Sequence, residues 1–282
     1  MKLASFRVDG RDSYGAVVGQ EIIDLGSRLG RYSDLKALIA TGAFAEAEAE
    51  VKKGKPEHRL DAVTFLPVIP RPEKIFCVGL NYEEHRVESG REPTEKPAIF
   101  MRTANSQVGH RQPMIRPRES TDLDYEGEIA VIIGKGGRRI SEADSWSHIA
   151  GYSCYNDGSV RDWQRHTAQW IPGKNWVATG GFGPWMVTAD EIPAKTVLTL
   201  TTRLNGTVMQ HASTDMMIHS IPRQIAYLST FADLEPGDVI VTGTPGGVGT
   251  RRNPPVYMKD GDTVEIEVDK VGVLVNPVKA EK

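Results

Sequence analysis

Residues 123–134 of this 282-residue chain read LDYEGEIAVIIG. The five residues at 129–133 are all apolar, and such a run is typical of a buried β-strand. Just before it stand Glu126 and Glu128, separated by a single glycine. Side chains two residues apart in a strand point to the same side. The stretch therefore predicts a strand that enters the core with two carboxylates side by side at its start.

The paired carboxylates have two interpretations. At an effective dielectric near 20, two such charges about 5 Å apart repel by roughly 3 kcal/mol. A buried pair should therefore either raise a pKa or bind a cation. The alternative is a solvated sheet edge, where the charges need no partner. This segment alone does not separate the two, so a third ligand is needed.

Asp157 is the candidate third ligand. It follows the expected strand at 150–155, and the alternative for an aspartate in such a position is a turn or a helix cap. Three carboxylates without a thiolate or an imidazole suit a hard cation. We therefore expect Glu126, Glu128 and Asp157 to bind Mg²⁺, with Mn²⁺ or Ca²⁺ as alternatives and zinc as a weaker one.

The rest of the chain predicts two unequal domains, 1–70 and 71–282. Prolines at 67, 70 and 72 mark the boundary. Before it we expect a hairpin with strands at 2–8 and 14–24 and a helix at 35–51, which is rich in alanine and glutamate. Beyond it, short strands are expected at 75–78, 98–101, 129–133, 197–204, 239–241 and 264–268, with one clear helix at 221–232 capped by Ser220.

This order of elements indicates an α+β, β-rich fold. A doubly wound parallel sheet is disfavoured because helices do not alternate with the strands. No Gly-x-Gly-x-x-Gly opens a helix after a strand, which disfavours a dinucleotide-dependent oxidoreductase. The glycines at 243–249 lack the Lys-Ser/Thr ending of a phosphate loop, so we expect a tight loop that brings backbone amides to a substrate.

Composition excludes several other classes. A net charge of −3 gives no general attraction to nucleic acid, and no apolar run approaches the roughly 20 residues that span a membrane. The two cysteines are too few for a disulfide framework. The first residues do not resemble a signal peptide. These features predict a cytoplasmic protein.

Five motifs, taken in order, resemble the fumarylacetoacetate hydrolase family. They are GLNYEEHRVE at 79–88, YEGE at 125–128, Asn156-Asp157, Lys174, and DVIVTGTPGGVG at 238–249. The resemblance covers about residues 70–277. It implies a mixed β-roll catalytic domain after a small N-terminal α/β domain, a homodimer, and Mg²⁺ or Mn²⁺ on the three carboxylates.

The resemblance also implies roles for other residues. His85 and Glu88 match a catalytic pair, and positions i and i+3 share one helix face, although a surface histidine has the same spacing. Lys174 matches a lysine that stabilises developing negative charge. The segment 83–96 resembles a mobile lid. The positions implied to bind substrate are Tyr82, Arg102, Arg161, Gln164 and Thr244; at Arg102 the family pattern has lysine, which puts substrate placement at that wall in doubt.

The expected function is metal-dependent hydrolysis of a carbon–carbon bond in an acylpyruvate-type 2,4-dioxo acid, such as fumarylpyruvate, maleylpyruvate or a related aromatic ring-cleavage product. In that reaction His85 and Glu88 activate water. The same enolate chemistry serves decarboxylases of the oxaloacetate type and isomerases of 2-hydroxy-dienedioates, and these alternatives stay open. A non-catalytic, metal-stabilised binding protein is the alternative of another class. The expected partner is a small oxo acid.

Overall fold

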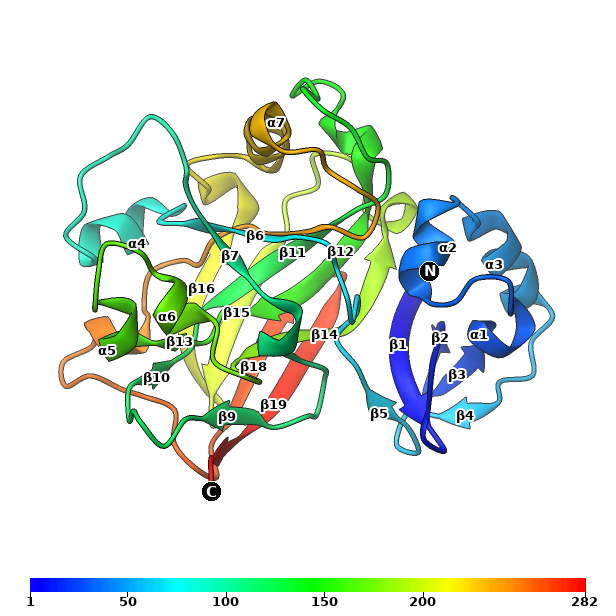
Figure 1. Cartoon of the computed structure of the whole chain (residues 1–282), viewed down its shortest axis with the longest axis horizontal. Coiled ribbons are helices and arrows are strands. Elements are labelled where there is room, and N and C mark those ends of the chain that lie inside the picture. The colour runs from blue at the N-terminus through cyan, green and yellow to red at the C-terminus, as the bar shows by residue number, and fades with distance from the viewer.

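The computed structural model describes all 282 residues and confirms the β-rich α+β class. Figure 1 shows a body of curved sheets, with the first 70 residues forming a smaller lobe at one side, drawn in blue. The first sheet contains, in spatial order, β4 (His58–Arg59), β3 (Glu21–Asp24), β2 (Arg11–Val18), β1 (Lys2–Val8), β14 (Gly180–Thr188), β12 (Ile149–Asn156), β11 (Gly127–Ile133), β17 (Val239–Val241), β6 (Ile75–Gly79) and β7 (Ala98–Arg102).

Two short strands join this sheet from the side, and a second sheet packs against it. β5 (Thr64–Phe65) pairs with β1, and β8 (Gln107–Val108) pairs with β14. The second sheet contains β16 (Thr207–Ser213), β15 (Thr199–Leu204), β18 (Thr263–Val268), β19 (Gly272–Ala280) and β9 (Met114–Arg116). β10 (Leu123–Asp124) and β13 (Ser159–Val160) form a separate pair.

β11 lies at the centre of the core, and all seven of its residues are buried. The odd-numbered residues of its apolar run 129–133, such as Val131, belong to the cluster that includes Ile266 of β18. The even-numbered residues of this run, such as Ile132, belong to the cluster that includes Leu3 of β1. Because successive side chains of a strand point to opposite faces, β11 requires apolar residues on both. This explains the continuous apolar run in the sequence.

The helices are short. They are α1 (Leu25–Arg28), α2 (Leu35–Ala40), α3 (Phe44–Lys52), α4 (Glu83–Glu88), α5 (Arg161–Gln164), α6 (Ile171–Lys174) and α7 (Ile221–Phe231). The expected helix at 221–232 is confirmed as α7, and the Ser220 side chain accepts a hydrogen bond from the Arg223 amide. None of the helices has the length and apolar character that a membrane span requires.

Two expectations for the N-terminal part are corrected. The helix expected at 35–51 is divided into α2 and α3. Gly42 lies between them with a positive φ of 65°, and a right-handed helix cannot continue through a residue in this conformation. The hairpin expected at 2–8 and 14–24 is a three-stranded meander of β1, β2 and β3, and its first turn lies at Asp9-Gly10. The residue run 14–24 therefore contains a second reversal, at Gly19-Gln20.

The division into domains 1–70 and 71–282 stays a prediction. The two parts share one sheet, since β1 pairs antiparallel with β14 through Lys2 and Val187 and through Leu3 and Met186. They also share one hydrophobic cluster, which contains residues of β1, β6, β11 and β17.

Candidate active site

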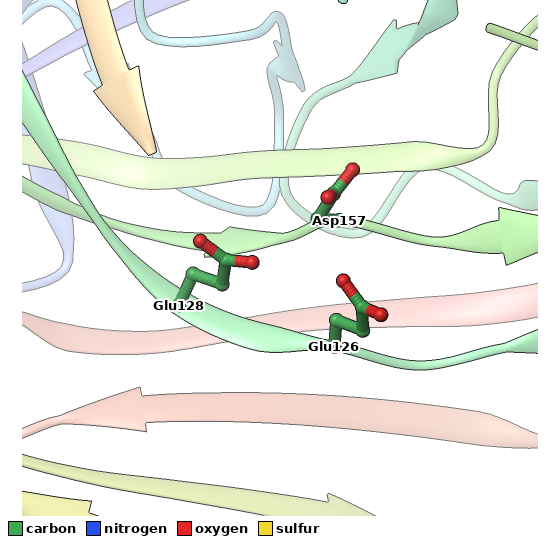
Figure 2. A group of neighbouring side chains, drawn as sticks. All are labelled: Glu126, Glu128 and Asp157. Carbon is green, nitrogen blue, oxygen red and sulfur yellow. The ribbon is translucent and has the colours of Figure 1, made fainter. Parts of the chain in front are cut away.

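Three buried carboxylates meet where β11 begins and its neighbour β12 ends. Glu128 lies on β11 and Glu126 just before it, while Asp157 follows β12. The backbone brings the two ends together, because the Asp157 amide donates to the Glu126 carbonyl oxygen at 2.8 Å. One ligand oxygen from each residue lies within 4.8 Å of the others. Figure 2 shows the three carboxylates arranged around a common space.

Lys174, the last residue of α6, bridges two members of this triad. Its Nζ donates to Glu126 Oε2 at 2.7 Å and to Asp157 Oδ2 at 2.6 Å. Burial alone would lower the pKa of Lys174, but the attraction of Asp157 and Glu126 outweighs it and raises the pKa. Lys174 is therefore a fixed cation, which is the state expected for a group that stabilises negative charge on a ligand.

Arg161, the first residue of α5, holds the other side of Glu126. Its Nη1 lies 2.7 Å from Glu126 Oε1, and its Nε donates to Asp124 Oδ2 at 2.8 Å. Burial raises the pKa of Glu126, but the charges of Lys174 and Arg161 outweigh it and hold this pKa well below its usual range. The Nη2 atom of Arg161 is buried and has no partner within the protein. It is free to donate to a bound ligand.

Arg102 lies behind the triad and not on a substrate wall, which corrects the sequence-based expectation. Its side chain is only 2% exposed, and its Nη1 donates to Asp157 Oδ1 at 2.5 Å. Three of its other four N–H donors are bound as well, by the Gly158 carbonyl oxygen and the hydroxyls of Ser106 and Thr179. A buried guanidinium needs all of these acceptors. Arg102 therefore orients Asp157.

These four hydrogen bonds predict the result of replacing Arg102 by lysine. A lysine cannot reach four acceptors that the planar guanidinium serves together, so buried acceptors lose their partners. We expect Arg102→Lys to lower the free energy of unfolding by about 1–3 kcal/mol, the usual cost of unsatisfied buried groups. Urea denaturation of the metal-free protein measures it. A change below about 0.5 kcal/mol would show that the four bonds contribute little.

Glu128 has no cationic partner. Only the Gly243 amide donates to its Oε2, and burial together with the charges of Asp157 and Glu126 raises its pKa well above the usual range. In the whole cluster, four buried carboxylates face three buried cations: Asp124, Glu126, Glu128 and Asp157 against Arg102, Arg161 and Lys174. When all four carboxylates are ionised, one negative charge is uncompensated, and without a cation the raised pKa of Glu128 shows which carboxylate keeps a proton instead. An oxygen-rich site with excess negative charge fits a hard divalent cation.

Metal binding at this site should release a proton. Glu128 has to ionise to become a ligand, and its raised pKa means that it keeps its proton at a pH where an ordinary glutamate has lost it. Apparent Mg²⁺ affinity should therefore rise with pH by about tenfold per unit until the pH passes the pKa of Glu128. Calorimetric titrations in buffers of different ionisation enthalpy count the released protons. Equal heats in all buffers would contradict this.

His85 and Glu88 form a hydrogen-bonded pair on α4. His85 Nδ1 lies 2.7 Å from Glu88 Oε1, and Glu88 Oε2 accepts a hydrogen bond from the Gly247 amide at 3.0 Å. The pair therefore fixes the ring of His85 and leaves its Nε2 without a partner in the protein. His85 is 6% exposed and lines the same cavity as Glu126 and Glu128. This geometry suits a residue that moves protons.

Three backbone amides of the loop at 243–249 donate to the protein's own carboxylates, whereas the sequence predicted that the loop amides face a substrate. The amide of Gly243 donates to Glu128, that of Gly247 to Glu88, and that of Gly249 to Asp124. Gly243 and Gly247 have positive φ values of 107° and 96°, which favour glycine. The loop thus ties the triad, the His85–Glu88 pair and the Arg161 partner together.

A cavity of about 340 Å³ contains most of the predicted site residues. His85, Glu126, Glu128, Arg161, Gln164, Lys174 and Thr244 line it. The Thr244 hydroxyl is already engaged by Gly127 and Gln210. Tyr82 does not line the cavity: it is 2% exposed and packs in the core, which corrects its expected contact with a substrate.

Sequence reasoning missed two features of the site. Asp124 is fully buried and accepts four hydrogen bonds, from the amides of Tyr125, Gly249 and Thr250 and from Arg161. Its only signal in the sequence is an acidic residue beside the expected ligands. The second is a group of exposed arginines at 91, 165 and 251 that also line the cavity.

Known proteins similar to this chain place it in a family. The model of the fumarylacetoacetate hydrolase C-terminal domain matches residues 74–279. A mitochondrial oxaloacetate tautomerase of Bos taurus is 42% identical over 218 residues, which are 77% of this chain and 69% of that protein. The corresponding Xenopus laevis protein is 37% identical over 289 residues, covering 99% of this chain and 90% of that one.

Among solved structures, maleylpyruvate hydrolase from Sphingobium sp. SYK-6, in complex with manganese(II) and pyruvate, superposes with a TM-score of 0.83. The two are 29% identical, and both chains are covered completely.

These relatives correct one expectation and confirm another. The expected cytoplasmic location is contradicted, because the relatives from Bos taurus and Xenopus laevis are named as mitochondrial. A search for a secretory signal peptide tests one route only and does not address delivery to other compartments. The resemblance seen in the sequence motifs is confirmed by a family match over 206 of the 282 residues, 74–279. The chain belongs to the fumarylacetoacetate hydrolase family.

Proposed function

We propose that this protein catalyses metal-dependent keto–enol tautomerisation of oxaloacetate or a closely related 2-oxo dicarboxylic acid. The observation that carries the proposal is the similarity, over 99% of the chain, to a protein named oxaloacetate tautomerase. The cavity supports it, since Glu126, Glu128, Lys174 and His85 line one space. Asp157 and Glu88 lie behind this lining, where they hydrogen-bond to Lys174 and to His85. Tautomerisation needs a charge-stabilising centre and one proton shuttle, and both are present.

Glu126, Glu128 and Asp157 would hold the cation, for which we propose Mg²⁺ or Mn²⁺. When bound, such a cation polarises the 2-oxo group and stabilises negative charge on its oxygen. Lys174 adds a second fixed positive charge, because only two of its three N–H donors are used by carboxylates. The free Nη2 of Arg161 is available to a substrate carboxylate.

The proton transfer is assigned to His85. Its Nε2 removes a proton from the carbon next to the 2-oxo group and delivers it to the 2-oxo oxygen, which gives the enol; in the reverse direction the same nitrogen moves the enol proton back to the carbon. Glu88 accepts from Nδ1 and stabilises the imidazolium that forms between these steps. The Gly247 amide keeps the Glu88 carboxylate in place. No water nucleophile is consumed.

Hydrolysis of an acylpyruvate-type substrate is the second candidate. The relative named maleylpyruvate hydrolase, solved with manganese(II) and pyruvate, favours it. In that reaction the His85–Glu88 pair would activate water for attack on a second carbonyl, and a carbon–carbon bond would break. Decarboxylation of oxaloacetate and isomerisation of 2-hydroxy-dienedioates would use the same charge-stabilising groups.

One assay separates tautomerisation, decarboxylation and hydrolysis. The protein, stripped of metal and reloaded with Mg²⁺ or Mn²⁺, is mixed with oxaloacetate or with maleylpyruvate, and products are followed by NMR and mass. Tautomerisation changes the enol-to-ketone rate without a change of mass; decarboxylation releases CO₂, and hydrolysis releases pyruvate and a second acid. Buffer containing the metal alone and the Glu128→Gln variant give the background. Bound metal with no turnover on either acid would favour the binding-protein alternative.

The assembly is a further proposal. We propose a homodimer, as the family resemblance implies. Sedimentation or light scattering at several protein concentrations measures the mass, and a monomer at every concentration would contradict it.

A further inference from the structure

The cavity is divided by charge between its floor and its mouth. Its two acidic lining residues, Glu126 and Glu128, are buried and belong to the triad. Three arginines at 91, 165 and 251 line the same cavity and are exposed. We call these three residues the arginine rim. No acidic residue outside the triad lines the cavity, so it runs from an acidic, metal-binding floor to a basic mouth.

The arginine rim comes from three separate segments. Arg91 follows α4, Arg165 follows α5, and Arg251 ends the short 3-10 turn η5 (Gly249–Arg251). Figure 1 shows α4 and α5 on the same side of the molecule, with the orange segment after β17 passing close by. Three segments that are distant in the sequence thus each contribute one arginine to the same opening. This arrangement indicates a site for an anion, since guanidinium groups bind planar oxyanions well.

No rim arginine is neutralised by the protein, because none lies within 4.0 Å of a carboxylate oxygen. Two of them are held by neutral acceptors. Arg251 Nη2 donates to the Ser89 carbonyl oxygen at 3.2 Å, and Arg165 Nη2 donates to the Thr250 hydroxyl at 2.8 Å. These bonds restrict the side chains but use one donor each and leave the positive charge available.

We propose that Arg165 and Arg251, assisted by Arg91, determine specificity by binding a distal carboxylate of the substrate. The proposal rests on the proposed function, which places the 2-oxo acid group at the other end of the substrate against the triad. A cavity near 340 Å³ falls in the range of about 300–1,000 Å³ that holds drug-sized ligands. It is roomier than a four-carbon acid needs. The favoured substrates are therefore 2-oxo dicarboxylates long enough to reach from the triad to the arginine rim.

The test compares two ligands of equal carbon number, 2-oxoadipate and 2-oxohexanoate, which differ in one terminal carboxylate. Calorimetry of the Mg²⁺-loaded protein gives both dissociation constants. The wild-type protein should bind 2-oxoadipate about tenfold more tightly, and added salt should reduce the difference because the rim is exposed. The double variant Arg165→Gln/Arg251→Gln keeps only Arg91 and should bind the two ligands within about twofold of each other. A preference that stays near tenfold in this variant would overturn the proposal.

Arg223→Gln is the matched control. Arg223 is also exposed and also donates through Nη2 to a carbonyl oxygen of the segment after α4, that of Glu95 at 3.1 Å, but it does not line the cavity. The tenfold preference should survive in this variant. Its loss here would mean that general surface charge, and not the arginine rim, recognises the carboxylate.

Deuterium exchange at the carbon next to the 2-oxo group separates this inference from the proposed function. Exchange that occurs without any preference between the two ligands supports the proposed function and overturns the arginine rim. A binding preference that vanishes in the double variant, without any exchange, supports the rim and contradicts the tautomerase proposal. When both hold, the double variant should raise KM for 2-oxoadipate about tenfold and leave kcat within about twofold.

Discussion

Replacing Glu128 by glutamine is expected to abolish metal binding and metal-dependent turnover, and yet to stabilise the metal-free protein. Glu128 is buried without a cationic partner, and burial together with Asp157 and Glu126 raises its pKa. A raised carboxyl pKa favours the neutral form in the folded state. Stability is therefore full at low pH and is lost as the pH rises through the folded pKa. Glutamine cannot ionise and escapes this loss.

The measurement is thermal unfolding of metal-free protein at pH 5 and pH 8. Glu128→Gln should raise Tm at pH 8 by several degrees, since about 1 kcal/mol corresponds to roughly 2–4 °C in proteins near this size, and the gain should shrink at pH 5. Calorimetry with Mg²⁺ should show no binding. A variant that is less stable than the wild type at pH 8 would contradict the account.

Glu126→Gln is the matched control, with the opposite expected effect on stability. The Glu126 carboxylate is paired with Lys174 and Arg161 at 2.7 Å each. Removing its charge leaves two buried cations short of a partner, which costs about 3–5 kcal/mol in comparable cases. Both variants should lose turnover, so the contrast in stability isolates the unpaired carboxylate.

Replacing His85 by alanine is expected to lower kcat by about 10²–10⁴-fold, the usual contribution of a general acid–base group. Metal binding should persist, because His85 belongs to the His85–Glu88 pair and is not one of the three carboxylates of the triad. Turnover on oxaloacetate with saturating Mg²⁺, together with a calorimetric metal titration, measures both quantities. A fall of kcat below threefold would exclude His85 as the proton carrier.

Two neighbours on α4 refine that result. Glu88→Gln keeps an acceptor for the Gly247 amide but cannot stabilise an imidazolium, so we expect a smaller loss of about tenfold. Glu84→Gln changes an exposed acid on the same helix outside the cavity and should leave kcat unchanged. Equal losses in both variants would indicate damage to α4 rather than loss of a proton relay.

The sequence was sufficient to predict those strands and helices whose pattern of apolar residues is local. The apolar run at 129–133 predicted β11, and the capped amphipathic pattern predicted α7, because burial on a fixed face leaves a period in the sequence. β14 left no such signal. Its sequence GGFGPWMVT contains three glycines and a proline, which are typical of a loop, and its strand conformation depends on pairing with the distant strands β1 and β12.

The site residues that follow from a local sequence pattern were predictable as well, and those that depend on long-range contacts were not. The triad followed from two glutamates at positions i and i+2 and an aspartate after a strand, and the structure brings all three together. The position of Arg102 behind Asp157 was not predictable, because the two residues are 55 apart and their pairing depends on the fold. Nor did the glycines at 243–249 indicate that their amides would serve the protein's own carboxylates.

The pairing of β1 with β14 makes the first strand of the chain a cover for an otherwise open sheet edge. Leu3 and Phe6 of β1 are fully buried, and Met186 of β14 is buried opposite Leu3. A fragment beginning at residue 71 would expose unpaired amides and carbonyls of β14 beside apolar side chains, the combination that recruits strands of other molecules. By covering this edge of β14, the N-terminal lobe should reduce edge-to-edge association between molecules during folding, independently of any contribution to catalysis.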